Sequence, residues 1–248
     1  MTGLDHIDLK ECEKRGIKVI SLQGETQFLR EVTSTAEHTI GLMIALLRNY
    51  LVALSGPWLL RDAYIGHKLK GKKICLIGGQ GRIGTQVCKV VEALGMRPYL
   101  FDIVYEEPFW LQWFGKITGL EDEEDTLIDR LNDVLSRSDI VSIHIPLSGN
   151  EGFFTREMFE QMKNNAYFIN TSRSKVVEDG ALIYALKNKL IAGAAVDFTD
   201  DPELVKYAAE SDNLILTNHI GGVTHEDWAL TEKFIIKKID EYMEKNDV

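Results

Sequence analysis

Short apolar runs alternate with amphipathic segments from residue 73 to residue 217. The apolar runs predict strands at 73–77, 98–101, 139–145, 166–170, 192–196 and 214–217. The segments between them predict helices at 82–94, 127–135, 156–162 and 179–187. Continuously apolar strands separated by helices are typical of a parallel sheet with both faces covered. The sequence therefore predicts an α/β fold, built on a doubly wound parallel sheet.

Further elements flank this region. We expect a short helix at 5–15, a strand at 18–22, a helix at 35–47 and an amphipathic helix at 225–245. Ser34 or Thr35 can cap the helix at 35–47, whose apolar residues recur at helical spacing. Residues 103–126 do not fit the alternation. Their acidic run is expected to be a solvated loop, and their aromatic cluster is either a local plug of the core or a contact surface.

Charge and cysteine content limit the partners and the compartment. The 248-residue chain carries a formal net charge of −10. Proteins that bind phosphate backbones or anionic membranes usually carry the opposite sign, so we expect no nucleic acid and no membrane as a partner.

The cysteines Cys12, Cys75 and Cys88 lie far apart, which excludes a zinc ribbon and a disulfide framework and suits a reducing compartment. No signal peptide is visible, and the apolar stretch 40–54 is too short to span a bilayer. A cytoplasmic protein is expected.

A glycine motif follows the first apolar strand of the alternating region. Residues 79–84, Gly79-Gln80-Gly81-Arg82-Ile83-Gly84, have the pattern GxGxxG between a predicted strand and a predicted helix. Such glycines allow a tight turn and a close approach of the backbone to a pyrophosphate, which the helix N-terminus then binds. Asp102 ends the next strand, close to the expected interval of about 20 residues. A carboxylate there binds ribose hydroxyls and repels a 2′-phosphate, so NAD is favoured over NADP.

Three segments at the ends of later strands carry groups suited to hydride transfer. They contain Arg173, Asp197 with the acidic residues that follow it, and His219. Open α/β sheets bind ligands at these strand ends. Reduction of a 2-keto acid needs a cation to bind the carboxylate and polarise the carbonyl. It also needs a proton donor with a pKa near 7, which His provides, and a carboxylate to orient that His. The sequence gives no indication of a metal site.

These segments together resemble the D-isomer-specific 2-hydroxyacid dehydrogenase family, the phosphoglycerate dehydrogenase-like group. The resemblance also rests on the segments at 2–8, 15–19, 35–38, 69–72, 144–146, 170–173 and 218–222. It implies a Rossmann NAD-binding domain at 35–223 and a truncated flavodoxin-like substrate domain. Residues 1–34 would be the remnant of that substrate domain, and 224–248 a helix that returns to it. The family's upstream substrate-domain strands are not in this sequence.

The resemblance also implies roles for single residues. Arg173 is similar to the substrate-binding arginine, His219 to the general acid/base, and Asp197 to the residue that holds the nicotinamide carboxamide. The implied cofactor-binding residues are Gly79, Gly81, Arg82, Ile83, Gly84, Asp102, His144, Pro146, Thr171, Ser172, Arg173, Asp197, His219, Gly221 and Gly222. His6 and His38 are expected to make packing or capping contacts.

The sequence departs from the family pattern at three points. The family's third catalytic group is usually a Glu before Pro, and the matching residue here is Asp201, in a loop one residue shorter. Asp200 and Glu203 are the alternatives for that role. The phosphate-binding turn holds one extra residue, and Ser174 stands where the family usually has Gly.

These observations favour an NAD-dependent enzyme that transfers a hydride between NAD(H) and a small D-2-hydroxy acid or 2-keto acid. Arg173, Asp201 and His219 would be its catalytic residues. The alternatives are a non-enzymatic NAD-binding protein with a regulatory or scaffold role, and an inactive truncated fragment. The resemblance also implies a homodimer, for which the helix at 35–47 and the segment 50–58 offer a hydrophobic arm.

Overall fold

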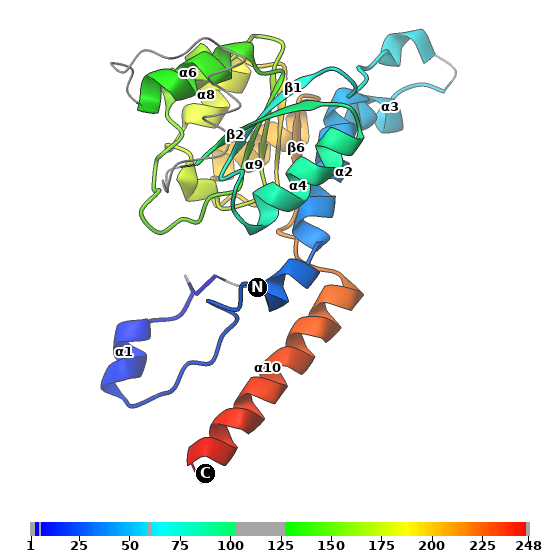
Figure 1. Ribbon diagram of the computed structural model, residues 1–248. Coiled ribbons are helices and arrows are strands. Elements are labelled where there is room, and N and C mark those ends of the chain that lie inside the picture. The colour runs from blue at the N-terminus through cyan, green and yellow to red at the C-terminus, as the bar shows by residue number, and fades with distance from the viewer. Residues whose placement is uncertain (1–2, 5, 59–60, 103–126, 247–248) are drawn as a thin grey trace. The chain divides into compact units, whose positions relative to one another are not determined.

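The computed structural model describes residues 3–4, 6–58, 61–102 and 127–246 (Figure 1). The segment 103–126, for which the sequence predicts a solvated loop and an aromatic plug or contact surface, lies outside these residues. The chain divides into two compact units. One unit spans Thr35–Gly221, and the other combines Met1–Ser34 with Gly222–Val248.

The larger unit is built on a parallel sheet of six strands. In chain order the strands are β1 (Lys73–Ile77), β2 (Arg97–Phe101), β3 (Ile140–Ile143), β4 (Tyr167–Asn170), β5 (Gly193–Val196) and β6 (Leu214–Leu216). Their order in the sheet is β2-β1-β3-β4-β5-β6, and every neighbouring pair is parallel. The predicted parallel sheet is therefore confirmed. All six carboxyl ends lie on one edge of the sheet, and the direction of winding reverses between β1 and β3, where open α/β sheets bind their ligands.

Helices cover both faces of the sheet (Figure 1). Residues of α2 (Ser34–Leu47) and α4 (Arg82–Ala93) pack on one face. Residues of α6 (Leu127–Arg137), α7 (Arg156–Gln161), α8 (Ala181–Lys187) and α9 (Pro202–Glu210) pack on the other. Alternate residues of β1 serve the two layers: Ile74 and Leu76 face α2 and α4, whereas Cys75 and Ile77 face the opposite layer. This explains why the strand is apolar throughout.

Short elements complete the larger unit. They are α3 (Tyr50–Ser55) and the 3₁₀ helices η2 (Arg61–Tyr64) and η3 (Ser174–Val176). Helix α9 was not predicted from the sequence. It begins with two standard start signals, because Asp201 accepts a hydrogen bond from the Glu203 N–H as the N-cap and Pro202 occupies the first turn.

The smaller unit contains α1 (Leu9–Lys14), η1 (Phe28–Glu31) and α10 (His225–Asn246). Its core joins Leu22, Leu29 and Val32 to one side of α10. Phe28 stacks on Phe234 with ring centroids 3.8 Å apart. The predicted strand at 18–22 is wrong, because the structure has no strand there. An apolar run forms a ladder only beside another extended backbone, and no strand of the described chain pairs with it.

Candidate active site

The glycines of the turn between β1 and α4 lie where a side chain would meet other atoms of the protein. Gly78 has a positive φ of +79°, and a Cβ there would lie 2.7 Å from the carbonyl oxygen of His144. A Cβ on Gly84 would lie only 2.2 Å from the carbonyl oxygen of Gly78. Gly81 is the N-cap of α4 and offers no side-chain hydrogen bond to the helix. Helix N-termini of this kind bind a dinucleotide pyrophosphate through their backbone N–H groups.

Arg82 and Ile83 are the first two residues of α4, where the sequence predicts the helix at 82–94 to begin. Asp102 follows β2, and its Oδ2 accepts a hydrogen bond from the N–H of Gln80 at 3.0 Å. Gln80 lies in the glycine turn, which holds one residue more than the family pattern. The turn therefore fixes the carboxylate proposed to bind the ribose. The residues present suit NAD, because the tight turn leads into the N-terminus of α4 and the Asp102 carboxylate is held beside that turn.

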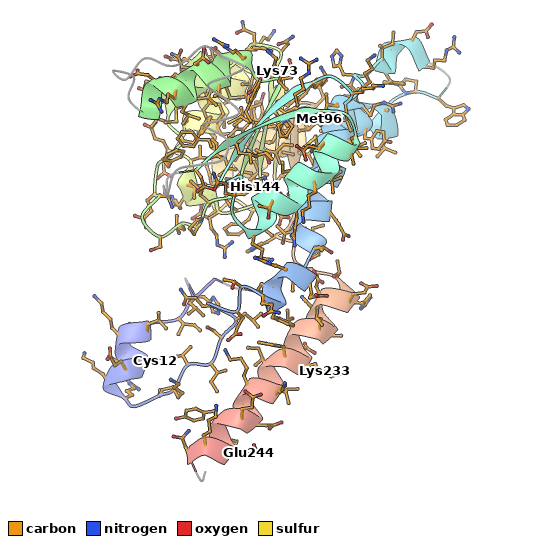
Figure 2. All side chains as sticks on the ribbon, viewed as in Figure 1. Cys12, Lys73, Met96, His144, Lys233 and Glu244 are labelled. Atoms are coloured by element: carbon orange, nitrogen blue, oxygen red, sulfur yellow. The ribbon has the colours of Figure 1, made fainter. Side chains whose placement is uncertain are left out.

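His144 and Pro146 follow β3 at the same edge. Figure 2 shows His144 and Lys73, which begins β1, at opposite ends of the sheet. The Nε2 of His144 lies 2.9 Å from Ser142 Oγ, and the N–H of His144 donates to the carbonyl of Ile77. Burial lowers the pKa of His144 to about 4, so its ring is neutral at pH 7. Its neutral ring adds no charge beside the glycine turn.

The low pKa of His144 predicts a pH-dependent stability. A histidine in an unfolded chain has a pKa near 6.5, so the unfolded state takes up a proton between pH 6.5 and 4 that the folded state does not. The contribution of His144 to the free energy of unfolding is therefore full above pH 6.5. It should fall by about 2–3 kcal/mol as the pH drops to 4. Urea unfolding measures the free energy of unfolding across this pH range. This free energy should decrease less in His144→Asn than in the wild type, whereas His67→Asn, changed at an exposed position, should follow the wild type. Parallel curves for wild type and His144→Asn would contradict the prediction.

The segment after β4 is shaped by Asn170. Its Oδ1 accepts from the N–H and the Oγ of Ser172, at 2.9 and 2.8 Å, and its Nδ2 donates to the carbonyl of Arg173 at 2.9 Å. Thr171 is buried, and its Oγ1 lies 2.8 Å from that of Thr39 on α2. These bonds fix the loop that carries the predicted substrate-binding arginine, whose Nη1 donates to the carbonyl of Ser172.

Asp197, at the end of β5, is the centre of a buried hydrogen-bond network. Its Oδ1 accepts from Thr217 Oγ1 at 2.7 Å and from the N–H of Ile220 at 2.9 Å, and it lies 3.2 Å from His38 Nε2. Its Oδ2 accepts from the N–H of Gly221 at 2.8 Å. Burial alone would raise the pKa of Asp197. The hydrogen bonds from His38, Thr217 and the two backbone N–H groups outweigh that effect, so its pKa is lowered and it is ionised.

His219 lies in the loop that this network holds. Its N–H donates to the carbonyl of Asp197 at 2.5 Å, and its φ of +57° is in the left-handed region. Its ring packs beside that of Phe198, with centroids 5.2 Å apart. Gly221 follows in the same loop, and Gly222 begins the C-terminal part of the smaller unit.

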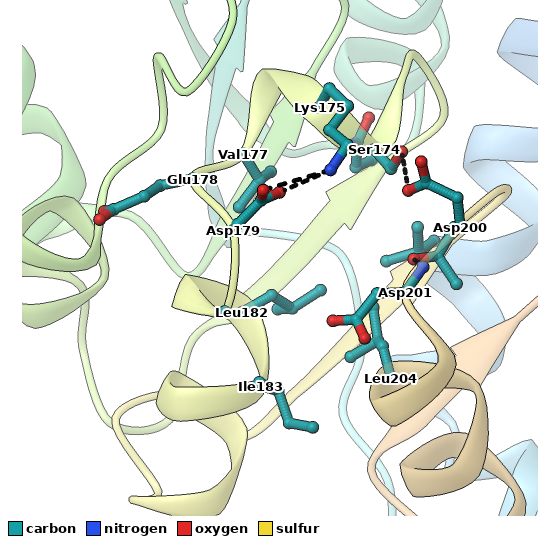
Figure 3. A pocket seen from close by; sticks show the side chains of 14 residues that line it. Ser174, Lys175, Val177, Glu178, Asp179, Leu182, Ile183, Asp200, Asp201 and Leu204 are labelled. Atoms are coloured by element: carbon teal, nitrogen blue, oxygen red, sulfur yellow. Dashed lines mark hydrogen bonds and ion pairs between the residues drawn. The ribbon is translucent and has the colours of Figure 1, made fainter.

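The structure does not bring Asp201 to His219. The carboxylate of Asp201 caps α9, and no hydrogen bond or ion pair joins it to His219 within the part of the chain that the structure describes. Asp200 instead accepts from Ser174 Oγ at 3.2 Å. Figure 3 shows both carboxylates at a separate cavity between η3, α8 and α9, which Leu182 and Leu204 also line. The third alternative, Glu203, pairs with Lys187 on α8 at 2.5 Å.

Three residues that position the site were not assigned to it from the sequence. They are Asn170, His38 and Thr217, each of which lies within or beside a motif that was recognised. Sequence position alone predicted only a packing or capping role for His38. Among the described residues, no cluster of three or more His, Cys, Asp or Glu side chains could hold a metal ion. None of the described helices is long and apolar enough to cross a membrane.

The chain belongs to the D-isomer specific 2-hydroxyacid dehydrogenase family, whose NAD binding domain matches residues 40–221. This match confirms the resemblance inferred from the motifs. Glyoxylate reductase of Thermofilum pendens is 36% identical over 241 residues, which cover 90% of this chain and 64% of that protein. D-3-phosphoglycerate dehydrogenase of Bacillus subtilis is 32% identical over 231 residues, covering 90% of this chain and 40% of that protein. The chain thus spans 40–64% of the length of these two relatives.

Solved structures agree with this assignment. D-lactate dehydrogenase of Aquifex aeolicus, solved with NAD and lactic acid, superposes with a TM-score of 0.75 at 25% identity. That match covers 98% of this chain and 74% of the other. The fold prediction of a Rossmann-type NAD-binding domain is therefore confirmed.

Proposed function

We propose that the protein is an NAD-dependent D-2-hydroxyacid dehydrogenase. The observation that carries the proposal is the common position of the site segments. The glycine turn, Arg173, Asp197 and His219 all follow carboxyl ends of parallel strands in one unit, which belongs to a family of such enzymes. The substrate would be a small 2-hydroxy acid or its 2-keto acid, as the activities of the glyoxylate reductase and D-3-phosphoglycerate dehydrogenase relatives suggest.

Each group has a distinct task in this proposal. NAD(H), when bound, supplies or accepts the hydride. Arg173 binds the substrate carboxylate and polarises the carbonyl, because a guanidinium presents paired N–H groups to a carboxylate. His219 donates a proton to the carbonyl oxygen during reduction and removes it during oxidation. The N–H groups at the start of α4 bind the pyrophosphate, and Asp102 binds ribose hydroxyls.

A second candidate function is supported by the position of Asp201. Because this carboxylate caps α9, it does not orient His219 or stabilise the imidazolium form in the observed structure. An NAD-binding protein with a regulatory or scaffold role needs the glycine turn and Asp102 but no such carboxylate. NADH oxidation with a panel of 2-keto acids separates the two functions. Binding without turnover would favour the second.

Cofactor binding tests both functions. Calorimetry should give a much lower dissociation constant for NADH than for NADPH, because Asp102 repels a 2′-phosphate. Asp102→Ala should reduce this discrimination, with NADH affinity falling about tenfold for the loss of a hydrogen bond to a charged group. Asp62→Ala, at an exposed position in η2, is the matched control. Equal affinity of the wild-type protein for the two cofactors would contradict the proposal.

Assembly and location complete the proposal. We expect a homodimer that buries more than about 1,000 Å². Leu54 in α3 and Trp58 just after this helix support this expectation, because these apolar residues are 85% and 88% exposed. Light scattering at micromolar concentration tests it, and a monomer would contradict it.

A cytoplasmic location fits the three free cysteines. Residues 1–34 and 224–248 would be part of the substrate domain.

A further inference from the structure

Helix α2 contacts the loops at the ends of three strands through two consecutive side chains. Thr39 bonds to Thr171 after β4. His38 places its Nε2 3.2 Å from Asp197 Oδ1 after β5 and 3.2 Å from Thr217 Oγ1 after β6. The His38 side chain is 18% exposed and that of Asp197 is 4% exposed. The helix therefore supplies a mostly buried polar group to the network that holds the His219 loop.

The hydrogen-bond pattern fixes the proton on the His38 ring. The Thr217 hydroxyl donates its hydrogen to Asp197 Oδ1, so it can only accept from His38. Asp197 is an ionised acceptor as well. Both neighbours of His38 Nε2 are thus acceptors, and Nε2 must carry a hydrogen that is shared between them. The opposite tautomer would place a lone pair against two oxygens.

The same carboxylate fixes the backbone on both sides of the His219 ring. Asp197 accepts the N–H groups of Ile220 and Gly221 through its two oxygens, and its carbonyl accepts the N–H of His219. A Cβ on Gly221 would lie 2.7 Å from Asp197 Oδ2 and 3.3 Å from His38 Cδ2. The loop is therefore packed directly on this pair, and His219 is held in its left-handed conformation by it.

We propose that His38 is a positioning residue for His219, acting through Asp197. It fixes the rotation of the Asp197 carboxylate, and that carboxylate fixes the His219 loop. This inference rests on the proposed function, because its catalytic consequence requires His219 to transfer a proton. Small displacements of a proton donor cost much of its effect, since about 1 Å can lower the rate about 10²-fold.

The test compares three variants. His38→Phe keeps an aromatic ring but removes the donor, His38→Gln offers an amide donor in its place, and His67→Gln is a control at an exposed position. For His38→Phe we expect kcat for a 2-keto acid to fall about 10- to 100-fold, with a shifted pH profile. The dissociation constant of NADH and the KM of the keto acid should change less than about threefold. His38→Gln should recover most of kcat, and His67→Gln should match the wild type.

Hydrogen exchange gives a readout that does not depend on turnover. The amides of Ile220 and Gly221 should exchange about tenfold faster in His38→Phe, as expected when a bond to a charged group is lost. In the wild-type protein, ¹⁵N spectra should find the His38 ring protonated on Nε2, and this measurement requires no variant to fold. Unchanged exchange in His38→Phe, or a ring protonated only on Nδ1, would overturn the inference. If the wild type reduces no keto acid, the proposed function fails, and the exchange and tautomer measurements still decide the role of His38.

Discussion

His219→Ala is expected to lower the turnover of a 2-keto acid by about 10²–10⁴-fold, the contribution of general acid–base catalysis. NADH binding should persist, with a dissociation constant within about threefold of the wild-type value. The reason lies in the separation of tasks. The glycine turn and Asp102 hold the dinucleotide at the ends of β1 and β2. His219 follows β6, the last strand at the opposite end of the strand order from β2.

His225→Ala is the matched control for this variant. His225 is exposed at the start of α10, six positions further along the chain. Stopped-flow reduction at saturating NADH measures the chemical step, and fluorescence titration measures cofactor binding. Retention of more than about a tenth of the turnover in His219→Ala would remove it as the proton donor.

Gly84→Ala is expected to destabilise the protein by about 2–3 kcal/mol and to weaken NADH binding at least tenfold. The added Cβ would lie 2.2 Å from Gly78 O and 2.6 Å from Gly79 Cα. Both obstacles are backbone atoms, so a side-chain rotation cannot relieve the clash. The turn or the first residues of α4 must shift, and either shift moves the N–H groups proposed to bind the pyrophosphate. Urea unfolding and calorimetry measure the two effects.

Gly41→Ala separates this clash from the general effect of adding a methyl group. Gly41 lies within α2, and a Cβ there would have no neighbour within 4 Å. Alanine has the higher helix propensity, so this variant should gain about 0.5–1 kcal/mol. Equal stability of Gly84→Ala and the wild type would show that the turn accommodates a Cβ atom. That result would contradict the inference that the turn requires glycine at position 84.

Sequence patterns predicted the elements that need only apolar surroundings on both sides. The predictions failed where an element depends on one particular neighbour or on a signal that was given another role. Strand β1 was predictable because any strand between two helical layers must be apolar on both faces. The run at 18–22 has a similar composition, but a strand also needs a neighbouring backbone, which composition does not report. Helix α9 was missed because its start signals, Asp201 and Pro202, were interpreted only as part of a catalytic loop.

The same distinction applies to the candidate site. The positions of Arg173, Asp197 and His219 after strand ends were predicted from local motifs. The partner of Asp197 was not, because His38 is separated from Thr217 by 179 positions and meets it only when α2 packs on the sheet. The role proposed for Asp201 required a distance to His219 that depends on the path of a shortened loop, and no local pattern encodes that path.

The crowded glycine turn also limits how the gene can change. Every single-base substitution that alters the meaning of a glycine codon without stopping translation introduces a residue with a Cβ atom. At Gly78, Gly79 and Gly84 such an atom would lie 2.2–2.8 Å from backbone oxygens of the folded protein. Every amino-acid change that a single base can cause at these three codons is therefore sterically costly. Among the single-base changes at these codons, only the synonymous ones leave the backbone of the turn in place.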